Sequence, residues 1–192
     1  MKLVAGLGNP GPEYVWSRHN AGWLALDFFA GKASLGEPRT KFNGAFWPSS
    51  NVLGESVAFL KPYTYMNLSG KSVAEAARYF DIPPSDVFVV FDDVAIPFGT
   101  LRYRPKGSAG GQRGMISVLG ALGTIEVPRL RIGMGGPPPS YDIKDWVLGV
   151  MPKEHRDAWP DIEALAWDAL SKWLRGSAGE GFTLKMSEDC KK

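Results

Sequence analysis

The chain has 192 residues and a formal net charge of +2 at neutral pH, and 44% of its residues are hydrophobic. These values are ordinary for one globular domain with a substantial core, and the overall charge says little about partners. No apolar run approaches the length of a membrane span. Because residues 6–12 break the first apolar run too early for a signal peptide, we expect a cytoplasmic protein.

Apolar runs and helical spacings alternate along the whole chain. In chain order they predict a strand at 2–7, a helix at 19–31, strands at 44–47 and 57–60, a helix at 69–80, strands at 87–93 and 101–104, a helix at 113–122, a strand at 130–134, a loop at 135–140 and a helix at 153–174. This alternation predicts an α/β fold. We expect a single-domain three-layer sandwich over 1–192, with a mixed, mostly parallel twisted sheet flanked by helices. From about residue 176 the chain is polar, which predicts a loosely held tail.

The glycines of "GLGNPG", at 6–11, match the G-x-G-x-x-G pattern of dinucleotide-binding folds. That pattern needs a helix that opens at the third glycine and an acidic residue about twenty positions later, at the end of a second strand. Here Pro10 and Pro12 flank Gly11, and the nearest acid, Asp27, lies inside a helical pattern. We therefore expect the glycines to form a tight turn at the end of the first strand, where the turn presents Asn9.

Polar residues gather at further points where predicted strands end or helices begin. They are His19 and Asn20, Met66 and Asn67, Asp92 and Asp93, and the glycine-rich loop 106–114. Open α/β sheets bind ligands at the carboxyl ends of their strands, so these segments could converge on one cleft. Each residue also has a plain structural interpretation, because Asn20 could cap a helix, Asp92 could bind backbone amides, and His19 could be a buried structural histidine.

Cysteine and histidine usage excludes several chemistries. Cys190 is the only cysteine, so there is no internal disulfide, and its polar tail does not suit a nucleophile. The only histidines are His19 and His155, and His155 lies among charges that predict a solvated helix surface. Neither a zinc-ligand spacing, a G-x-S-x-G elbow nor a Walker A loop occurs. We expect no metal and no cofactor, and a hydrolase of this sequence would use a His–Asp pair to activate water.

Positive charge is concentrated between residues 102 and 131, where Glu126 is the only acid. The cations are Arg102, Arg104, Lys106, Arg113, Arg129 and Arg131. A local basic field of this kind suits a polyanion, although a solvated face would have the same composition.

Several blocks of the sequence resemble the bacterial-type peptidyl-tRNA hydrolases in order and spacing, over about positions 2–150. The blocks are "GLGNPGPEYVWSRHNAGW", "KPYTYMNLSG", "VVFDDVAIPFGTLRYRPKGSAGG", "PRLRIGMGGPP" and "DWVLG". The resemblance implies an enzyme that cleaves the ester joining a peptide to the 3′ ribose of a tRNA, without metal or organic cofactor and as a monomer.

The resemblance also implies roles for individual residues. His19 corresponds to the catalytic histidine, and Asp92 to the aspartate that supports it. Asn9 and Asn67 correspond to substrate-binding asparagines, Tyr14 and Met66 to peptide-contacting residues, and Arg102 and Arg104 to tRNA-binding cations.

The chain departs from the family in the glycine-rich loop. The family commonly reads G-G-H-N-G there, whereas this chain has Gln112 and Arg113 between the glycines. Arginine cannot accept a hydrogen bond, so Arg113 could contact a phosphate of the tRNA 3′ end or could weaken catalysis. Because some chloroplast relatives of the family act as splicing factors, a non-catalytic RNA-binding protein is the alternative function.

Overall fold

A single sheet of eight strands runs through the molecule. The computed structural model describes residues 1–187, so Cys190 lies outside the described residues. The sheet order is β2-β3-β4-β1-β5-β7-β6-β8. The strands are β1 (Lys2–Gly6), β2 (Arg39–Lys41), β3 (Gly44–Val52), β4 (Glu55–Pro62), β5 (Val87–Asp93), β6 (Thr100–Arg104), β7 (Arg129–Gly133) and β8 (Phe182–Lys185).

Helices connect and cover these strands. The α-helices are α1 (Ala21–Lys32), α2 (Ser69–Tyr79), α3 (Arg113–Leu122), α4 (Ile143–Leu148), α5 (Lys153–Asp157) and α6 (Trp159–Leu174). Short 3₁₀ turns are η1 (Pro12–Tyr14), η2 (Arg18–Asn20), η3 (Met66–Leu68) and η4 (Pro84–Asp86).

The sheet is mixed, as predicted, but it is not mostly parallel. The central pairs β1–β4, β1–β5 and β5–β7 are parallel, whereas β2–β3, β3–β4, β6–β7 and β6–β8 are antiparallel. The flanking pairs β2–β3 and β3–β4 are hairpins, closed by turns whose central residues have positive φ, such as Asn43 and Gly54. Turns this short can join only antiparallel strands, because a parallel pair needs a long crossover.

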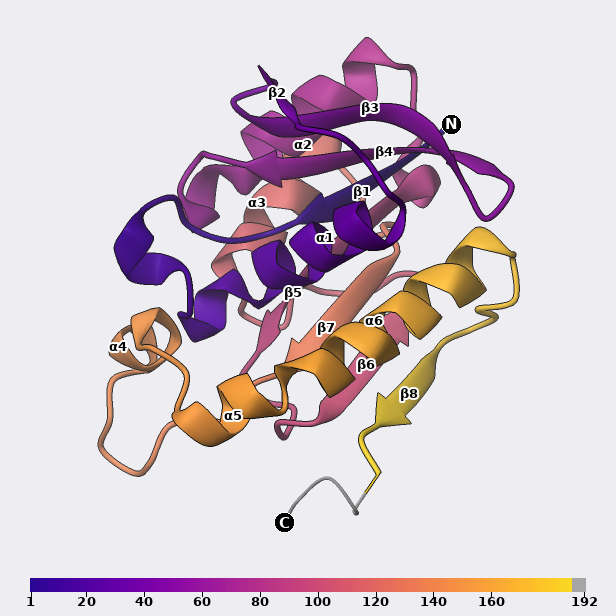
Figure 1. The fold of residues 1–192 in the computed structure, drawn as a ribbon. Helices are drawn as coiled ribbons and strands as arrows, with labels where there is room; N and C mark the ends of the chain where they lie inside the picture. Colours follow the sequence, from indigo (N-terminus) through magenta and orange to yellow (C-terminus); the bar gives the residue numbers. More distant parts are fainter. Residues whose placement is uncertain (188–192) are drawn as a thin grey trace.

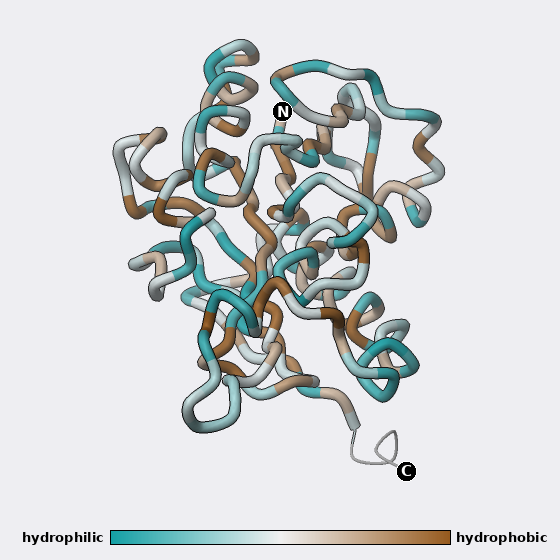
Figure 2. The backbone as a smooth tube through the Cα atoms, turned by 90° about the vertical axis from the view of Figure 1, so that its left-hand side faces the viewer, coloured by the Kyte–Doolittle hydropathy of each residue, from teal (hydrophilic) through white to brown (hydrophobic). Residues whose placement is uncertain are grey.

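Helices lie on both faces of the sheet, which confirms the three-layer architecture (Figure 1). Alternate residues of β1 enter different cores, because successive side chains of a strand point to opposite faces. Val4 packs with the α1 and α6 residues, whereas Leu3 and Ala5 pack with those of α2 and α3. Figure 2 shows many of the hydrophobic segments running through the middle of the molecule, where the strands lie.

Three segments after residue 140 differ from the prediction. Residues 153–174 form two helices rather than one, because Pro160 has no N–H to donate and is tolerated only in the first turn of α6. Helix α4 was not predicted, and Asp142 caps it by accepting from the N–H groups of Lys144 and Asp145. Within the predicted loose tail from about 176, residues 182–185 form β8, which pairs with β6 at the sheet edge, and residues 188–192 lie outside the described residues.

Candidate active site

The carboxyl ends of β1 and β5 lie side by side because these strands are parallel neighbours. A cavity of about 450 Å³ opens at this edge, between η2, η3, the loop before α3, and α4. Residues singled out from the sequence contribute to its lining, namely Asn9, Tyr14, His19, Met66, Asn67, Asp92, Asp93 and Arg113. The structure therefore brings these residues together, as the strand-end argument expects.

The glycines of residues 6–11 let the end of β1 pack closely against α1. A Cβ on Gly6 would collide with the carbonyl of Gly22, and a Cβ on Gly8 would collide with the Trp23 ring. The helix after Gly11 is a single 3₁₀ turn, and α1 begins only at Ala21. Because a dinucleotide fingerprint needs a helix that opens at its third glycine, this turn has a different role, namely to bring Asn9 to the cavity.

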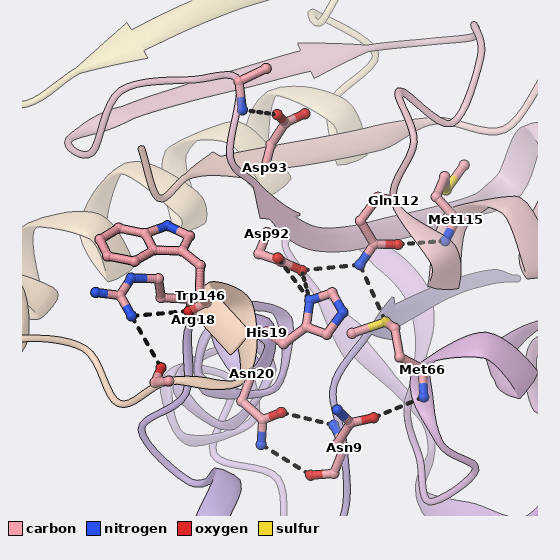
Figure 3. A network of polar contacts seen from close by, with 12 residues as sticks. Asn9, Arg18, His19, Asn20, Met66, Asp92, Asp93, Gln112, Met115 and Trp146 are labelled. Atoms are coloured by element: carbon pink, nitrogen blue, oxygen red, sulfur yellow. Dashed lines mark hydrogen bonds and ion pairs between the residues drawn. The ribbon is translucent and has the colours of Figure 1, made fainter. Parts of the chain in front are cut away.

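His19 and Asp92 form a buried pair in the cavity wall (Figure 3). The Nδ1 atom of His19 lies 2.8 Å from each carboxylate oxygen of Asp92. Only 8% of His19 and 1% of Asp92 is exposed. An ionised carboxylate only accepts hydrogen bonds, so Nδ1 is the protonated nitrogen of the neutral ring. The Nε2 atom is left as a proton acceptor toward the cavity.

Asn20 positions Asn9 and does not cap α1 with its side chain. The Asn20 amide oxygen accepts from the backbone N–H of Asn9 at 2.8 Å, and its NH₂ group donates to the Asn9 carbonyl at 3.1 Å. The Asn9 side-chain oxygen accepts from the backbone N–H of Met66 at 2.8 Å. This bond fixes the orientation of the Asn9 amide, so its NH₂ group, for which residues 1–187 provide no acceptor, can donate to a substrate. Asn67, in contrast, is exposed.

Gln112 is a site residue that the sequence analysis named as a departure from the family pattern but to which it gave no role. It is the N-cap residue of α3, and its side-chain oxygen accepts from the N–H of Met115 at 2.7 Å. Its NH₂ group donates to Asp92 Oδ1 at 3.0 Å and lies 3.2 Å from the sulfur of Met66. Its place directly before a predicted helix is a signal for capping, but no sequence feature indicates the bond to Asp92.

Helix α4 forms one wall of the cavity, and Arg18 anchors its end. The Arg18 guanidinium stacks 3.6 Å from the centre of the Trp146 ring and donates to the carbonyls of Trp146 and Gly149. Burial lowers the pKa of Arg18 below its usual value. Because Arg18 directly precedes His19, this anchor also holds the turn η2 that carries the histidine. The sequence analysis missed this role.

Two cations of the basic segment serve the fold. Arg129 is 2% exposed and donates to the carbonyls of Val127, Gly107, Ser108 and Ile125. Burial, and secondarily the charge of Arg131, lowers the pKa of Arg129 to about 10. Arg131 donates from Nε to Asp93 at 2.5 Å. Arg129 thus anchors the base of the glycine-rich loop and Arg131 pairs with Asp93, so the basic field is smaller than the count of charges suggests.

Arg102 and Arg104 lie on β6, outside the cavity lining. Their neighbours Leu101 and Tyr103 face the core shared with α6, so the two arginines point to the opposite face of the sheet. Arg104 donates to the carbonyls of Tyr103 and Phe182. Arg113 is exposed at the first position of α3, on the rim of the cavity.

His155 is not on a solvated surface, contrary to the prediction. Its ring stacks on Phe98 with the ring centres 3.6 Å apart, and burial, with a smaller effect from Arg18, lowers the pKa of His155. Within residues 1–187, no three His, Cys, Asp or Glu side chains are grouped as a metal site would require. No helix in the same range has the length and apolarity needed to cross a bilayer.

Both the sequence and the structure of this chain are similar to those of known proteins. A family model described as peptidyl-tRNA hydrolase matches residues 3–189. A peptidyl-tRNA hydrolase of Symbiobacterium thermophilum is 52% identical over 151 residues, which cover 77% of this chain and 78% of the relative. One of Brevibacillus brevis is 42% identical over 177 residues, covering 92% and 93% respectively. The crystal structure of peptidyl-tRNA hydrolase from Acinetobacter baumannii matches with a TM-score of 0.85 at 30% identity, covering 92% of this chain and 89% of that one.

Proposed function

The chain belongs to the peptidyl-tRNA hydrolase family, and we propose from this premise that His19 and Asp92 are its catalytic pair. It hydrolyses the ester bond between peptide and tRNA in peptidyl-tRNA and so frees the tRNA for reuse in translation. No finding favours the alternative of a non-catalytic RNA-binding protein. The observation that carries the assignment of the pair is the buried contact of His19 Nδ1 with Asp92, which leaves Nε2 available at the cavity.

In the proposed mechanism, His19 activates water. Nε2 removes a proton from water as the water oxygen attacks the ester carbonyl, and Asp92 stabilises the imidazolium that forms. When the tetrahedral intermediate collapses, the bond to the ribose oxygen breaks and the imidazolium returns its proton to that oxygen. The products are the peptide acid and the free 3′ hydroxyl of the tRNA. General-base help of this kind is worth about 10²–10⁴ in rate.

Asn9 is the best-placed donor for the negative charge on the carbonyl oxygen. Its amide is buried, and its orientation is fixed because the oxygen accepts from the Met66 N–H. A donor that is already oriented stabilises a developing oxyanion without reorganisation, and one such donor is worth about 10²–10³ in rate. Asn67 is exposed and would have to be ordered by the substrate, so we assign it to substrate binding.

The remaining predicted residues bind the substrate on both sides of the ester. Tyr14, Met66 and Asn67 line the cavity and would contact the peptide, and Arg113 on the rim would contact the 3′ end of the tRNA. Arg102 and Arg104 would contact phosphates farther along the tRNA, which requires no base readout. The whole set comes from one chain, which supports a monomer. We propose the cytoplasm as its location, because translation produces the substrate there.

The test is hydrolysis of labelled N-acetylaminoacyl-tRNA by His19→Ala. We expect turnover to fall at least about a hundredfold while tRNA affinity is retained, because the ring acts on water and does not contact phosphates. The matched control is His155→Phe, which removes the only other histidine and should keep wild-type turnover. Near-normal hydrolysis by His19→Ala would remove His19 from the mechanism. Sedimentation of the same preparations should give the 20.9 kDa mass of a monomer.

A further inference from the structure

Gln112 connects the first turn of α3 to the carboxylate of Asp92 (Figure 3). Its side-chain oxygen accepts from the backbone N–H of Met115, so the oxygen end of the amide faces the helix. The NH₂ end must then face Asp92, where it donates to Oδ1 at 3.0 Å. The two ends of an amide differ in hydrogen-bonding character, so a flipped side chain would lose both bonds. The orientation is therefore fixed by the backbone of α3.

Asp92 depends on this donor because it is almost entirely buried. A buried carboxylate needs hydrogen-bond donors in place of water. Within residues 1–187, the side chains that donate to it are His19 and Gln112, and both reach Oδ1. Nδ1 of His19 bonds to the two oxygens equally, whereas Gln112 bonds to one of them. The amide thus fixes the plane of the carboxylate that orients the His19 ring.

Other charged groups near the pair are engaged elsewhere or lie on the rim. Asp93 accepts from Arg131 and from the backbone N–H of Ala95. Arg18 is directed to the end of α4. Arg113 and Lys144 line the cavity and are exposed. Of the groups around Asp92, Gln112 is therefore the neutral one that contacts the carboxylate directly.

We propose that Gln112 is a positioning residue of the reaction, which holds Asp92 in the plane of His19 and limits how strongly Asp92 stabilises the protonated ring. This proposal rests on the proposed function of the pair. A neutral donor on Oδ1 withdraws part of the negative charge that the imidazolium would otherwise feel. When the donor is removed, the imidazolium should be more stable and the base form of His19 should appear only at higher pH. The positioning effect should lower turnover as well.

Two substitutions separate this role from helix capping. Gln112→Ser keeps an N-cap for α3, since serine is a favourable cap, but cannot reach Asp92. Gln112→Glu keeps the length and an oxygen for the Met115 N–H, and it places a second negative charge against Asp92. We expect the acidic limb of the kcat/KM–pH profile to move to higher pH by about one unit in Gln112→Ser and further in Gln112→Glu. Plateau kcat should fall about tenfold in both, with KM little changed.

A double variant tests whether Gln112 acts through Asp92. In an Asp92→Asn background, Gln112→Ser should no longer move the acidic limb, because no carboxylate charge remains to be shared. Wild-type-like melting temperatures would show that Gln112→Ser keeps the cap. An unchanged limb and plateau kcat in Gln112→Ser and Gln112→Glu, with His19→Ala inactive, would overturn this proposal alone. An active His19→Ala would instead overturn the proposed function and this inference with it.

Discussion

Replacing Asp92 by asparagine tests the central interaction of the site while it preserves shape. Asparagine has nearly the same volume, so the core around β5 should stay packed, and Gln112 can still donate to the remaining oxygen. What is lost is one negative charge, 2.8 Å from the Nδ1 of His19. The change therefore removes the charge that supports His19 and leaves the packing around the pair in place.

The expected effect has two components. Unit charges 4 Å apart interact by about 4 kcal/mol at an effective dielectric constant of 20, which corresponds to about three pH units. The dipole of the asparagine amide retains part of this interaction energy. We therefore expect the acidic limb of the kcat/KM–pH profile to move toward lower pH by about one to three units. The amide NH₂ can also donate to Nδ1 and so favour the ring with its proton on Nε2, which cannot accept from water. Plateau turnover should therefore fall, by less than in His19→Ala.

The assay is the pH dependence of kcat/KM and kcat between pH 4 and 9. Enzyme-free controls at each pH must show that the tRNA ester stays intact during the measurement. Asp93→Asn is the matched control for the limb, because Asp93 is the adjacent aspartate but pairs with Arg131. It should leave the limb in place. If the acidic limb of the kcat/KM–pH profile stayed at its wild-type pH in Asp92→Asn, the titrating base would not be affected by the Asp92 charge. The contact between Asp92 and His19 would then not contribute to catalysis.

Two further substitutions address the rim of the site and the fold. Arg113→Ala should weaken substrate binding and flatten the plot of log K against log salt by about 0.7–0.9 units, because one phosphate contact is lost, whereas an unchanged slope would show that Arg113 points away from the tRNA. Because burial lowers the pKa of His155, the folded state binds a proton less readily than the unfolded state, so stability is lost as the pH falls below about 6.5. His155→Phe should keep the stack on Phe98 and lose less stability than the wild type in urea denaturation between pH 7.5 and pH 5; equal losses would contradict this.

The strands and helices that form the two cores were predictable because burial imposes a pattern on their residues. β5 is buried throughout and reads as an uninterrupted apolar run, and α2 has apolar residues at helical spacing. β2 is mostly exposed and has no such pattern, and β8 is only four residues long, with Phe182 and Leu184 half-buried against the core; both strands lie at sheet edges. Their strand character comes from hydrogen bonds to a neighbour that the sequence does not identify. α4 was missed for a similar reason, because Val147 is the only fully buried one of its six residues.

The convergence of the site residues was predictable, but their bonds were not. The rule that ligands bind at the ends of parallel strands brings Asn9 and Asp92 to the same edge whatever the loops do. Which atoms meet depends on loop backbones, as the bonds between Asn20 and Asn9 illustrate. Arg129 shows the opposite error, because counting its charge as surface charge ignores that carbonyl oxygens can hold a buried guanidinium.

Gln112 and Arg113 are adjacent, yet the start of α3 gives them different surroundings. Gln112 is the cap and its amide turns toward Asp92, whereas Arg113 is the first helical residue and is exposed. The electrostatics of the site depend on which of these two positions carries the positive charge. A cation at 112 would pair with Asp92 and compete with His19 for its charge, so the imidazolium would lose the stabilisation that the mechanism requires. A neutral amide can hold the same carboxylate and leave most of its charge to His19. The loop can therefore carry a cation at the rim of the site only if the residue that contacts Asp92 remains uncharged.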